Sequence, residues 1–283
     1  MRPDSPYHAY FNARVAERAS WPPAVPRATA RIISTPRFAD EQGPAFRMLQ
    51  TLMELVSFAV ENDAVGRKAS WLTHRTWNPV GHIGTRALQS FYYYDAVRRE
   101  AEARGALTLC EVGLNGGHSA AVLLEAGGRS SRLQMFELGL PYTPVAQRVI
   151  ERLFPGQMNL VLGDSAVTMP RMYAERGAHC DVMSIDGDHR EPNFRRDLPH
   201  ALRLCRKGAL LLFDDMSSKG LIRHVVEEFA HDGRLDELQC TPDHDMRTPI
   251  LHRFDFEGNV SVSRNMAWCS ARSVGSWWVN DDK

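Results

Sequence analysis

Two short apolar runs in this sequence are each followed at once by acidic residues. Asp186 follows the run at 182–185, and the pair Asp214-Asp215 follows the run at 209–213. Neighbouring strands lie about 4.8 Å apart, so acids at two strand ends can converge on one cation. Clustered carboxylates repel one another unless a cation or hydrogen bonds compensate. The three aspartates, with water and substrate completing the shell, therefore predict a site for Mg²⁺ or another divalent cation.

A glycine-rich turn and two further polar groups follow three other apolar runs. In the turn, Gly113 and Gly117 allow a tight bend and a close approach to a ligand, and the next helix offers its N-terminal N–H groups. The turn lacks the GxGxxG spacing of dinucleotide-binding proteins. Glu137 ends the second run and could accept hydrogen bonds from a ribose diol, as in binders of NAD or of S-adenosylmethionine. Asp164 and Ser165 follow the third run and could receive an adenine amino group or cap a helix.

The order of apolar runs and amphipathic segments predicts how these residues are positioned. Apolar runs at 107–112, 133–136, 158–162, 182–185 and 209–213 alternate with helical patterns at 119–125, 145–154, 167–176 and 194–206. Such alternation is typical of βαβ units and a parallel sheet covered by helices on both faces. We predict a Rossmann-like, doubly wound α/β domain over residues 105–283, completed by a helix at 221–230 and strands near 235–240, 250–256 and 260–263. Ligands of such sheets bind at the carboxyl ends of the strands.

The first 104 residues differ from the rest in composition and residue pattern, and we predict an N-terminal arm followed by a helical cap. Residues 1–43 are rich in Pro and Arg, whereas 44–62 and 85–104 have helical spacing. The aromatic stretch 71–84 between these helices is either a lid over the substrate or ordinary packing. The aromatic run at 91–94 favours packing over a substrate wall.

Composition narrows the class of partner. The chain of 283 residues has 34 basic and 34 acidic residues, and no Lys/Arg stripe that would grip nucleic acid. No run approaches the roughly 18 apolar residues of a membrane span. The five cysteines are an odd number without a CxxC pair, which favours free, buried thiols in a reducing compartment. We therefore expect a small-molecule partner and a cytoplasmic location, with the Arg-rich N-terminus only weakly resembling a mitochondrial presequence.

The motifs also resemble a known family. EVGLNGGHS, the acid of MFELG, GDS, IDGDH with Asp197-Leu198 downstream, and GALLLFDD follow one another as in class I S-adenosylmethionine-dependent methyltransferases. More narrowly, they resemble the metal-dependent macrocin and rhamnosyl O-methyltransferases. The resemblance covers about residues 107–216, and it implies a mostly parallel seven-stranded sheet with one antiparallel edge strand.

The resemblance also implies roles for individual residues. The cofactor-binding set would be Glu111 near the cofactor's ammonium, Gly113, Gly117 and Ser119 near its methionine portion, Glu137 at the ribose, Asp164 and Ser165 at the adenine, and Asp186. Asp186, Asp214 and Asp215 would hold the metal. Asp188 or His189 would be the general base, and the sequence leaves this choice open.

The function expected from these features is Mg²⁺-assisted methylation of a hydroxyl on a small molecule, such as a sugar or a phenolic or polyketide-like compound. Methyl transfer from a sulfonium is an in-line displacement, so the acceptor oxygen must be held in place and deprotonated. Three alternatives remain: metal-independent methylation of nitrogen or of a protein, a non-catalytic cofactor-binding module, and a nicotinamide oxidoreductase. Trp277-Trp278 pack either on the core or in the subunit interface of a homo-oligomer.

Overall fold

The computed structural model describes residues 48–49, 51–53, 55–56, 83–140, 143–216, 221–241, 244–245 and 265–275. The N-terminal arm, the aromatic stretch before residue 83, the predicted strands at 250–256 and 260–263, and Trp277-Trp278 lie outside these residues. In the predicted helix at 44–62, the described residues are helical. Within the described part of the chain, no helix is both long and apolar enough to cross a membrane.

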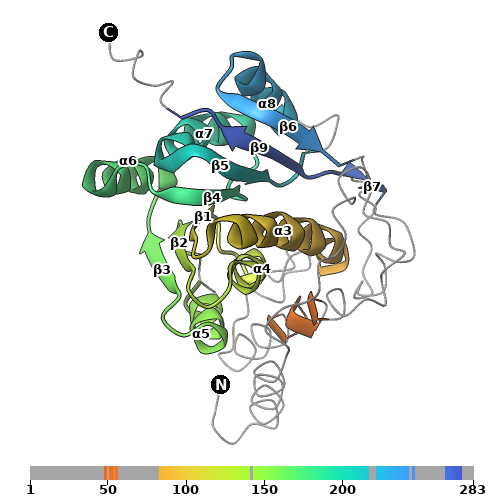
Figure 1. The fold of residues 1–283 in the computed structure, drawn as a ribbon, viewed down its shortest axis with the longest axis vertical. Helices are drawn as coiled ribbons and strands as arrows, with labels where there is room; N and C mark the ends of the chain where they lie inside the picture. Colours follow the sequence, from red (N-terminus) through yellow and green to blue (C-terminus); the bar gives the residue numbers. More distant parts are fainter. Residues whose placement is uncertain are drawn as a thin grey trace, which may run out of the picture.

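The described elements form an α/β domain with one large sheet (Figure 1). Its strands are β1 (Thr108–Val112), β2 (Arg132–Glu137), β3 (Met158–Leu162), β4 (Cys180–Ile185), β5 (Cys205–Phe213), β6 (Leu235–Cys240) and β9 (Cys269–Ser273). The helices are α3 (Ile83–Arg104), α4 (His118–Gly127), α5 (Thr143–Leu153), α6 (Ser165–Arg176), α7 (Glu191–Leu204) and α8 (Leu221–His231). A separate short pair is formed by β7 (His244–Asp245) and β8 (Asn265–Met266).

The strand order of the large sheet confirms the predicted doubly wound fold. The order is β3-β2-β1-β4-β5-β9-β6, and the pairs among β1 to β5 are all parallel. Strand order reverses between β1 and β4, and this is where a ligand site is expected in such a sheet. Strand β9 is antiparallel to both β5 and β6. The resemblance implied an antiparallel strand at the edge of the sheet. The antiparallel strand β9 instead lies inside the sheet, between β5 and β6.

Two apolar cores flank the sheet, one on each face. Helices α3, α4 and α5 cover one face together with alternate strand residues such as Leu109 and Val182. Helices α6, α7 and α8 cover the other face, onto which Cys110 and Met183 project. Successive strand residues point to opposite faces, so strands buried on both faces read as continuous apolar runs. This is why the sequence predicted the buried strands β1, β2, β4 and β5. The edge strands β3 and β6 were also predicted, although they are more exposed.

The end of one helix and one whole strand differ from the prediction, and both errors come from weak local patterns. The helix predicted over 194–206 ends at Leu204, because Cys205 already pairs with Cys180 in the sheet. Strand β9 was not predicted, since its sequence CSARS has no apolar run. Its small and polar side chains are nevertheless largely buried, because β9 lies between β5 and β6. The segment forms a strand because of its neighbours in the sheet, and not because of its local strand propensity.

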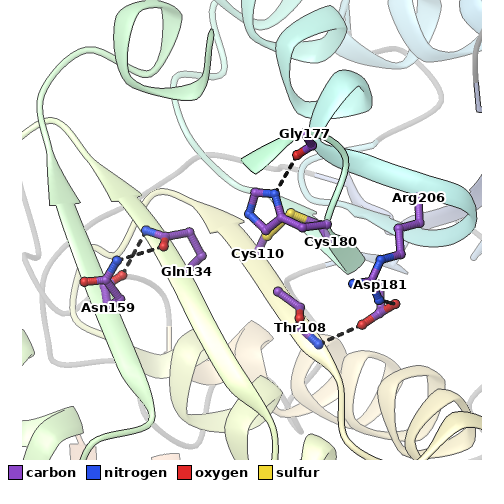
Figure 2. Close-up of a disulfide and its surroundings, with 9 residues drawn as sticks. Thr108, Cys110, Gln134, Asn159, Gly177, Cys180, Asp181 and Arg206 are labelled. Atoms are coloured by element: carbon purple, nitrogen blue, oxygen red, sulfur yellow. Dashed lines mark hydrogen bonds and ion pairs between the residues drawn. A yellow bond between two sulfur atoms is a disulfide. The ribbon is translucent and has the colours of Figure 1, made fainter. Parts of the chain in front are cut away.

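Four of the five cysteines are paired, so the prediction of free thiols is wrong for these four. Cys110 of β1 is bonded to Cys180 of β4, as Figure 2 shows, and Cys240 is bonded to Cys269 across β6 and β9. Cys205 is free and buried. The pairings depend on which strands are neighbours, which cysteine spacing does not reveal. They also remove the observation on which the expected reducing compartment rested, since disulfides persist mainly in oxidising environments.

We expect alkylation to distinguish this pairing from five free thiols. The native protein should resist iodoacetamide at Cys205, because burial raises the pKa of this thiol far above its ordinary value. Unfolded without reductant, the chain should take up one adduct, at Cys205, and after reduction it should take up five. Intact-mass spectrometry gives the count. Five adducts on the unfolded, unreduced chain would show that neither disulfide forms in solution.

Candidate active site

The glycine turn after β1 brings the ends of β1 and β4 together. Gly113 has φ +96°, and a Cβ placed on it would lie 2.2 Å from the backbone carbonyl oxygen of Asp186. Its N–H donates to the carbonyl of Phe136, and the N–H of Asp186 donates to the carbonyl of Val112. Glycine is required here because the backbone conformation is left-handed and because the next strand passes so close. The turn thereby fixes where Asp186 leaves β4.

Replacing Gly113 by alanine should therefore disrupt this edge of the sheet. We expect Gly113→Ala to lose more than about 2 kcal/mol of unfolding free energy, since backbone strain and a steric clash add together. Gly105→Ala is the matched control, because Gly105 has φ +82° and nothing within 4 Å of its built Cβ. Urea unfolding of both variants measures the difference. Equal losses would mean that the approach of Asp186 does not matter.

Helix α4 begins at this turn and points its N-terminus toward the strand ends. Gly117 is the residue before the helix, with φ +85°, and Ser119 lies in the first turn. A helix N-terminus offers free N–H groups and a positive dipole end, which suit a carboxylate. His118, the first residue of α4, is only 1% exposed. Together with Ser119 and Asp186 it lines a small cavity, to which α3 also contributes residues.

Glu111 and Glu137 occupy different depths at this end of the sheet. Glu111 is fully buried in β1, beside Ser184 of β4. Glu137 ends β2 and holds two loops: its Oε2 accepts from Leu114 N at 2.8 Å, and its Oε1 accepts from Gly139 N at 3.0 Å. The carboxylate predicted to bind a ribose thus already ties the glycine turn to the loop after β2. Each oxygen also accepts a second, longer hydrogen bond at 3.4 Å, from Asn115 N at Oε2 and from Leu140 N at Oε1, so a ribose hydroxyl would have to compete with these backbone groups.

Asp164 caps a helix in this structure. Its Oδ1 accepts from Ala166 N at 2.9 Å at the start of α6, and Arg196 lies against its exposed carboxylate. Ser165 donates from its hydroxyl to Asp197 Oδ2 at 2.8 Å. Burial raises the pKa of Asp197, and the Ser165 hydrogen bond partly offsets that rise. Of the two roles predicted for Asp164, the structure shows helix capping.

The acids after β4 and β5 come together, as the sequence predicted. Ligand atoms of Asp186, His189 and Asp214 all lie within 4.8 Å of one another. Asp215 joins them through His189, whose Nδ1 lies 3.1 Å from Asp215 Oδ2 and whose Nε2 lies 3.2 Å from Asp186 Oδ1. Asp215 adopts a left-handed backbone conformation, with φ +53°. That conformation is uncommon outside glycine and asparagine and marks a constrained turn.

The electrostatics of the cluster show an excess of negative charge. Burial raises the pKa of Asp214 well above its ordinary value, and the charges of Asp186 and Asp215 raise it further. Burial alone would lower the pKa of His189, but its hydrogen bonds to Asp186 and Asp215 outweigh burial and raise the pKa to about 11. The imidazolium therefore supplies a positive charge to two of the three acids.

These residues fit a divalent cation. Asp214 Oδ1 is buried and accepts no hydrogen bond, although Asp186 and Asp215 surround it with negative charge. Leaving a buried acceptor unsatisfied costs about 1–3 kcal/mol, and more for a charged group. Carboxylate oxygens converging on one point are the donors that Mg²⁺, Mn²⁺ and Ca²⁺ accept. The protonated His189 takes the place of such a cation between Asp186 and Asp215.

The two candidate bases are both engaged in this conformation. Asp188 accepts from Arg190 N and Nε, each at 2.9 Å, and from Asn193 Nδ2 at 2.6 Å. These contacts, led by the Arg190 side chain, hold the pKa of Asp188 below its ordinary value. His189 keeps its proton while Asp186 and Asp215 hold it. Either residue must exchange these partners before it can accept a proton from a substrate.

Sequence reasoning missed the contribution of α3. Gln89, Ser90 and Tyr93 line the same small cavity as Asp186. The tyrosine belongs to the aromatic run that favoured packing. The sequence does not show which tyrosine of the run faces the acids, because three consecutive residues on a helix point in three directions. Only the packing of α3 against the sheet determines this.

The region that carries these motifs is similar to a known protein family. Residues 110–216 match the sequence model of a family described as methyltransferase domain. No curated protein sequence matches the chain significantly. The match begins within β1 and ends after Asp215, so it contains the glycine turn and the whole acid cluster.

Solved structures share the fold at low sequence identity. An O-methyltransferase from Bacillus cereus in complex with SAH is 17% identical, with a TM-score of 0.51, covering 76% of this chain and 90% of that one. The O-methyltransferase TomG from Streptomyces achromogenes, involved in tomaymycin synthesis and in complex with SAM, is 16% identical, with a TM-score of 0.50, covering 76% and 89%. The CurJ carbon methyltransferase is 10% identical, with a TM-score of 0.52, covering 84% and 69%. The fold is common to enzymes that methylate oxygen and carbon, so the acceptor must be argued from the site.

Proposed function

We propose that this chain, whose residues 110–216 match the methyltransferase-domain family, transfers a methyl group from S-adenosylmethionine to a hydroxyl of a small molecule with the help of Mg²⁺ or a similar cation. The observation that carries the proposal is that Asp186 and Asp214 converge with His189 at two neighbouring strand ends, where an oxygen of Asp214 is buried without a hydrogen bond. Asp215 joins this group through His189. The acceptor class that we propose is a sugar or a phenolic or polyketide-like compound.

The chain's own residues divide the work along the rim of the sheet. The N-terminus of α4, with Ser119, faces the site where the amino-acid end of the cofactor would lie, and Glu137 would receive the ribose. Asp186, Asp214 and Asp215 would hold the cation, which when bound lowers the pKa of an acceptor hydroxyl and fixes its direction. A small cavity beside Asp186, lined also by His118 and Ser119, lies at this end of the site.

The base is proposed to be His189 or Asp188. His189 is the stronger candidate, because its ring lies between Asp186 and Asp215 and it becomes free to accept a proton once those acids have another cationic partner. Asp188 is held by Arg190 and Asn193 on the solvent side of the loop. A positioned base contributes about 10² to 10⁴ in rate.

One observation favours a second candidate, metal-independent methylation of a nitrogen or of a protein side chain. The imidazolium of His189 already compensates Asp186 and Asp215. With a cation supplied by the chain itself, these acids could serve structure and cofactor binding alone.

A transfer assay separates the two candidates. The protein is incubated with methyl-labelled S-adenosylmethionine and a panel of sugars, phenols, polyketides and amines, with Mg²⁺ or with EDTA. We expect label in a hydroxyl compound, with the signal lost in EDTA and restored by Mg²⁺. Labelling of an amine or a protein at the same rate in EDTA would establish the second candidate and refute the first.

A further inference from the structure

A second group of side chains able to bind a metal surrounds the disulfide between β1 and β4 (Figure 2). The Sγ atoms of Cys110 and Cys180 and a ring nitrogen of His179 all lie within 4.8 Å of one another. Both cysteines are fully buried in the core that α6, α7 and α8 cover. Cys180 begins β4, the strand whose other end leads to Asp186, so this group is distinct from the acid cluster. Two sulfurs and an imidazole nitrogen are ligands that Zn²⁺ prefers.

The ring of His179 is held in the form that binds a metal. Its Nδ1 lies 2.8 Å from the carbonyl oxygen of Gly177. A carbonyl oxygen can only accept a hydrogen bond, so in the neutral ring Nδ1 carries the hydrogen and Nε2 carries the lone pair. Histidines that bind metals usually donate their other ring N–H to a carbonyl or a carboxylate in this way. The backbone N–H of His179 also donates to the carbonyl of Leu204 at 2.8 Å, which fixes the residue beside the disulfide.

The disulfide leaves the Nε2 atom of His179 unsatisfied. Within the described part of the chain, this nitrogen is buried and has no hydrogen-bond partner. Leaving a buried acceptor in this state costs about 1–3 kcal/mol. The sulfurs of a disulfide carry no hydrogen, so they cannot donate to it. After reduction, two thiolates and this lone pair would be available to the same cation.

We propose that Cys110, Cys180 and His179 form a redox-controlled Zn²⁺ site, which binds the metal when the disulfide is reduced and releases it when the disulfide forms. A dithiol supplies two electrons and two protons, so that the disulfide becomes two thiols and the dithiol becomes a disulfide. Each thiol then loses its proton as Zn²⁺ binds, and the ion is held by two thiolates and the Nε2 lone pair. Three protein ligands leave the fourth tetrahedral position to water, which can enter because His179 is only partly buried. The inference does not depend on the proposed function, because none of the acids takes part.

The test uses the full chain with Co²⁺ as a spectroscopic substitute for Zn²⁺. The protein is reduced without oxygen by a phosphine, which becomes the phosphine oxide with an oxygen atom from water, and is titrated with Co²⁺ in excess Mg²⁺. Bonds from Co²⁺ to thiolates give a charge-transfer band in the near ultraviolet, whereas bonds to carboxylates do not, so the acid cluster does not contribute. We expect this band to saturate at one Co²⁺ per chain and to disappear when Zn²⁺ is added. The unreduced protein should show no band.

Three variants identify the ligands. His179→Gln should bind Co²⁺ at least about 100-fold more weakly, because losing a direct ligand costs more than losing a group that only orients one. This variant keeps both cysteines, so its unreduced form should melt at the same temperature as the natural protein. The double variant Cys240→Ala, Cys269→Ala removes the other disulfide, and Cys205→Ala removes the free buried thiol. Both should bind Co²⁺ with unchanged affinity, and circular dichroism checks that each reduced protein is folded.

The results that would overturn the inference differ from those that bear on methyl transfer. A reduced natural protein without the band, whether it stays folded or unfolds, refutes the site. Equal Co²⁺ affinity in His179→Gln shows that the imidazole is not a ligand and refutes it as well. A band that is lost in either cysteine control assigns the metal to other thiols and has the same consequence. The assay measures no methyl transfer, so each of these results leaves the proposed function standing.

Discussion

Replacing Asp214 by asparagine should abolish cation-dependent activity and at the same time stabilise the protein. Asp214 is the most buried of the three acids, and its pKa is raised by burial and by Asp186 and Asp215. Asparagine is isosteric with the protonated carboxyl and removes the charge that burial penalises. We expect methyl transfer to fall by about 100-fold or more, since a metal supplies several kcal/mol of transition-state stabilisation.

The stability effect has the opposite sign and makes the prediction more specific. An acid whose folded pKa is raised favours the folded state below its ordinary pKa, and this contribution is lost as pH rises and the buried group is forced to ionise. In EDTA near neutral pH, Asp214→Asn should therefore melt roughly 2–4 °C higher than the natural protein, as about 1 kcal/mol does in a domain of this size. Differential scanning calorimetry measures the shift. A lower melting temperature would show that Asp214 is not a source of repulsion in the metal-free fold.

Replacing Glu137 by glutamine should weaken cofactor binding more than any other single change at the rim outside the acid cluster. Glutamine keeps the size but can accept at only one of the two ends where Glu137 accepts backbone N–H groups, from Leu114 and from Gly139. We expect about a 10-fold or greater loss of SAH affinity, because hydrogen bonds to a carboxylate are about twice as strong as neutral ones. The unfolding free energy should fall by about 1–3 kcal/mol.

Asp181→Asn is a matched control for Glu137→Gln. Asp181 is also a buried carboxylate that accepts a backbone N–H, from Thr108 at 2.8 Å, but it lies at the opposite end of the strands beside Arg206, as Figure 2 shows. It should lose comparable stability with SAH affinity unchanged. Isothermal titration calorimetry with SAH gives both affinities. Equal affinity losses would mean that Glu137 acts through general stability and not at the cofactor.

The sequence predicted the parts of the fold that depend on local pattern. Strands β1, β2, β4 and the C-terminal part of β5 are buried on both faces, so their apolar runs identify them, and the acids after β4 and β5 follow from their positions at strand ends. Strand β9 could not be predicted in this way, because its burial comes from lying between β5 and β6. The disulfides were missed for a similar reason: Cys110 and Cys180 are 70 residues apart, and only strand order makes them neighbours.

Within the site, residue types were easier to predict than their partners. Asp186 and Asp214 converge as expected, whereas the sequence did not indicate that His189 would lie between Asp186 and Asp215. Tyr93 lines the cavity beside Asp186 only because of how α3 packs over the sheet, a contact between elements that no local pattern encodes. Contacts across elements, and not residue identity, are what the structure adds.

The most direct test of the account is the position of a bound metal. Crystals of the protein grown with SAH and Mn²⁺ would be measured on both sides of the manganese absorption edge. The account predicts one anomalous peak within coordination distance of carboxylate oxygens of Asp186, Asp214 and Asp215, with the His189 ring moved away from it. A fully occupied cofactor site with no manganese peak at these acids would contradict the account.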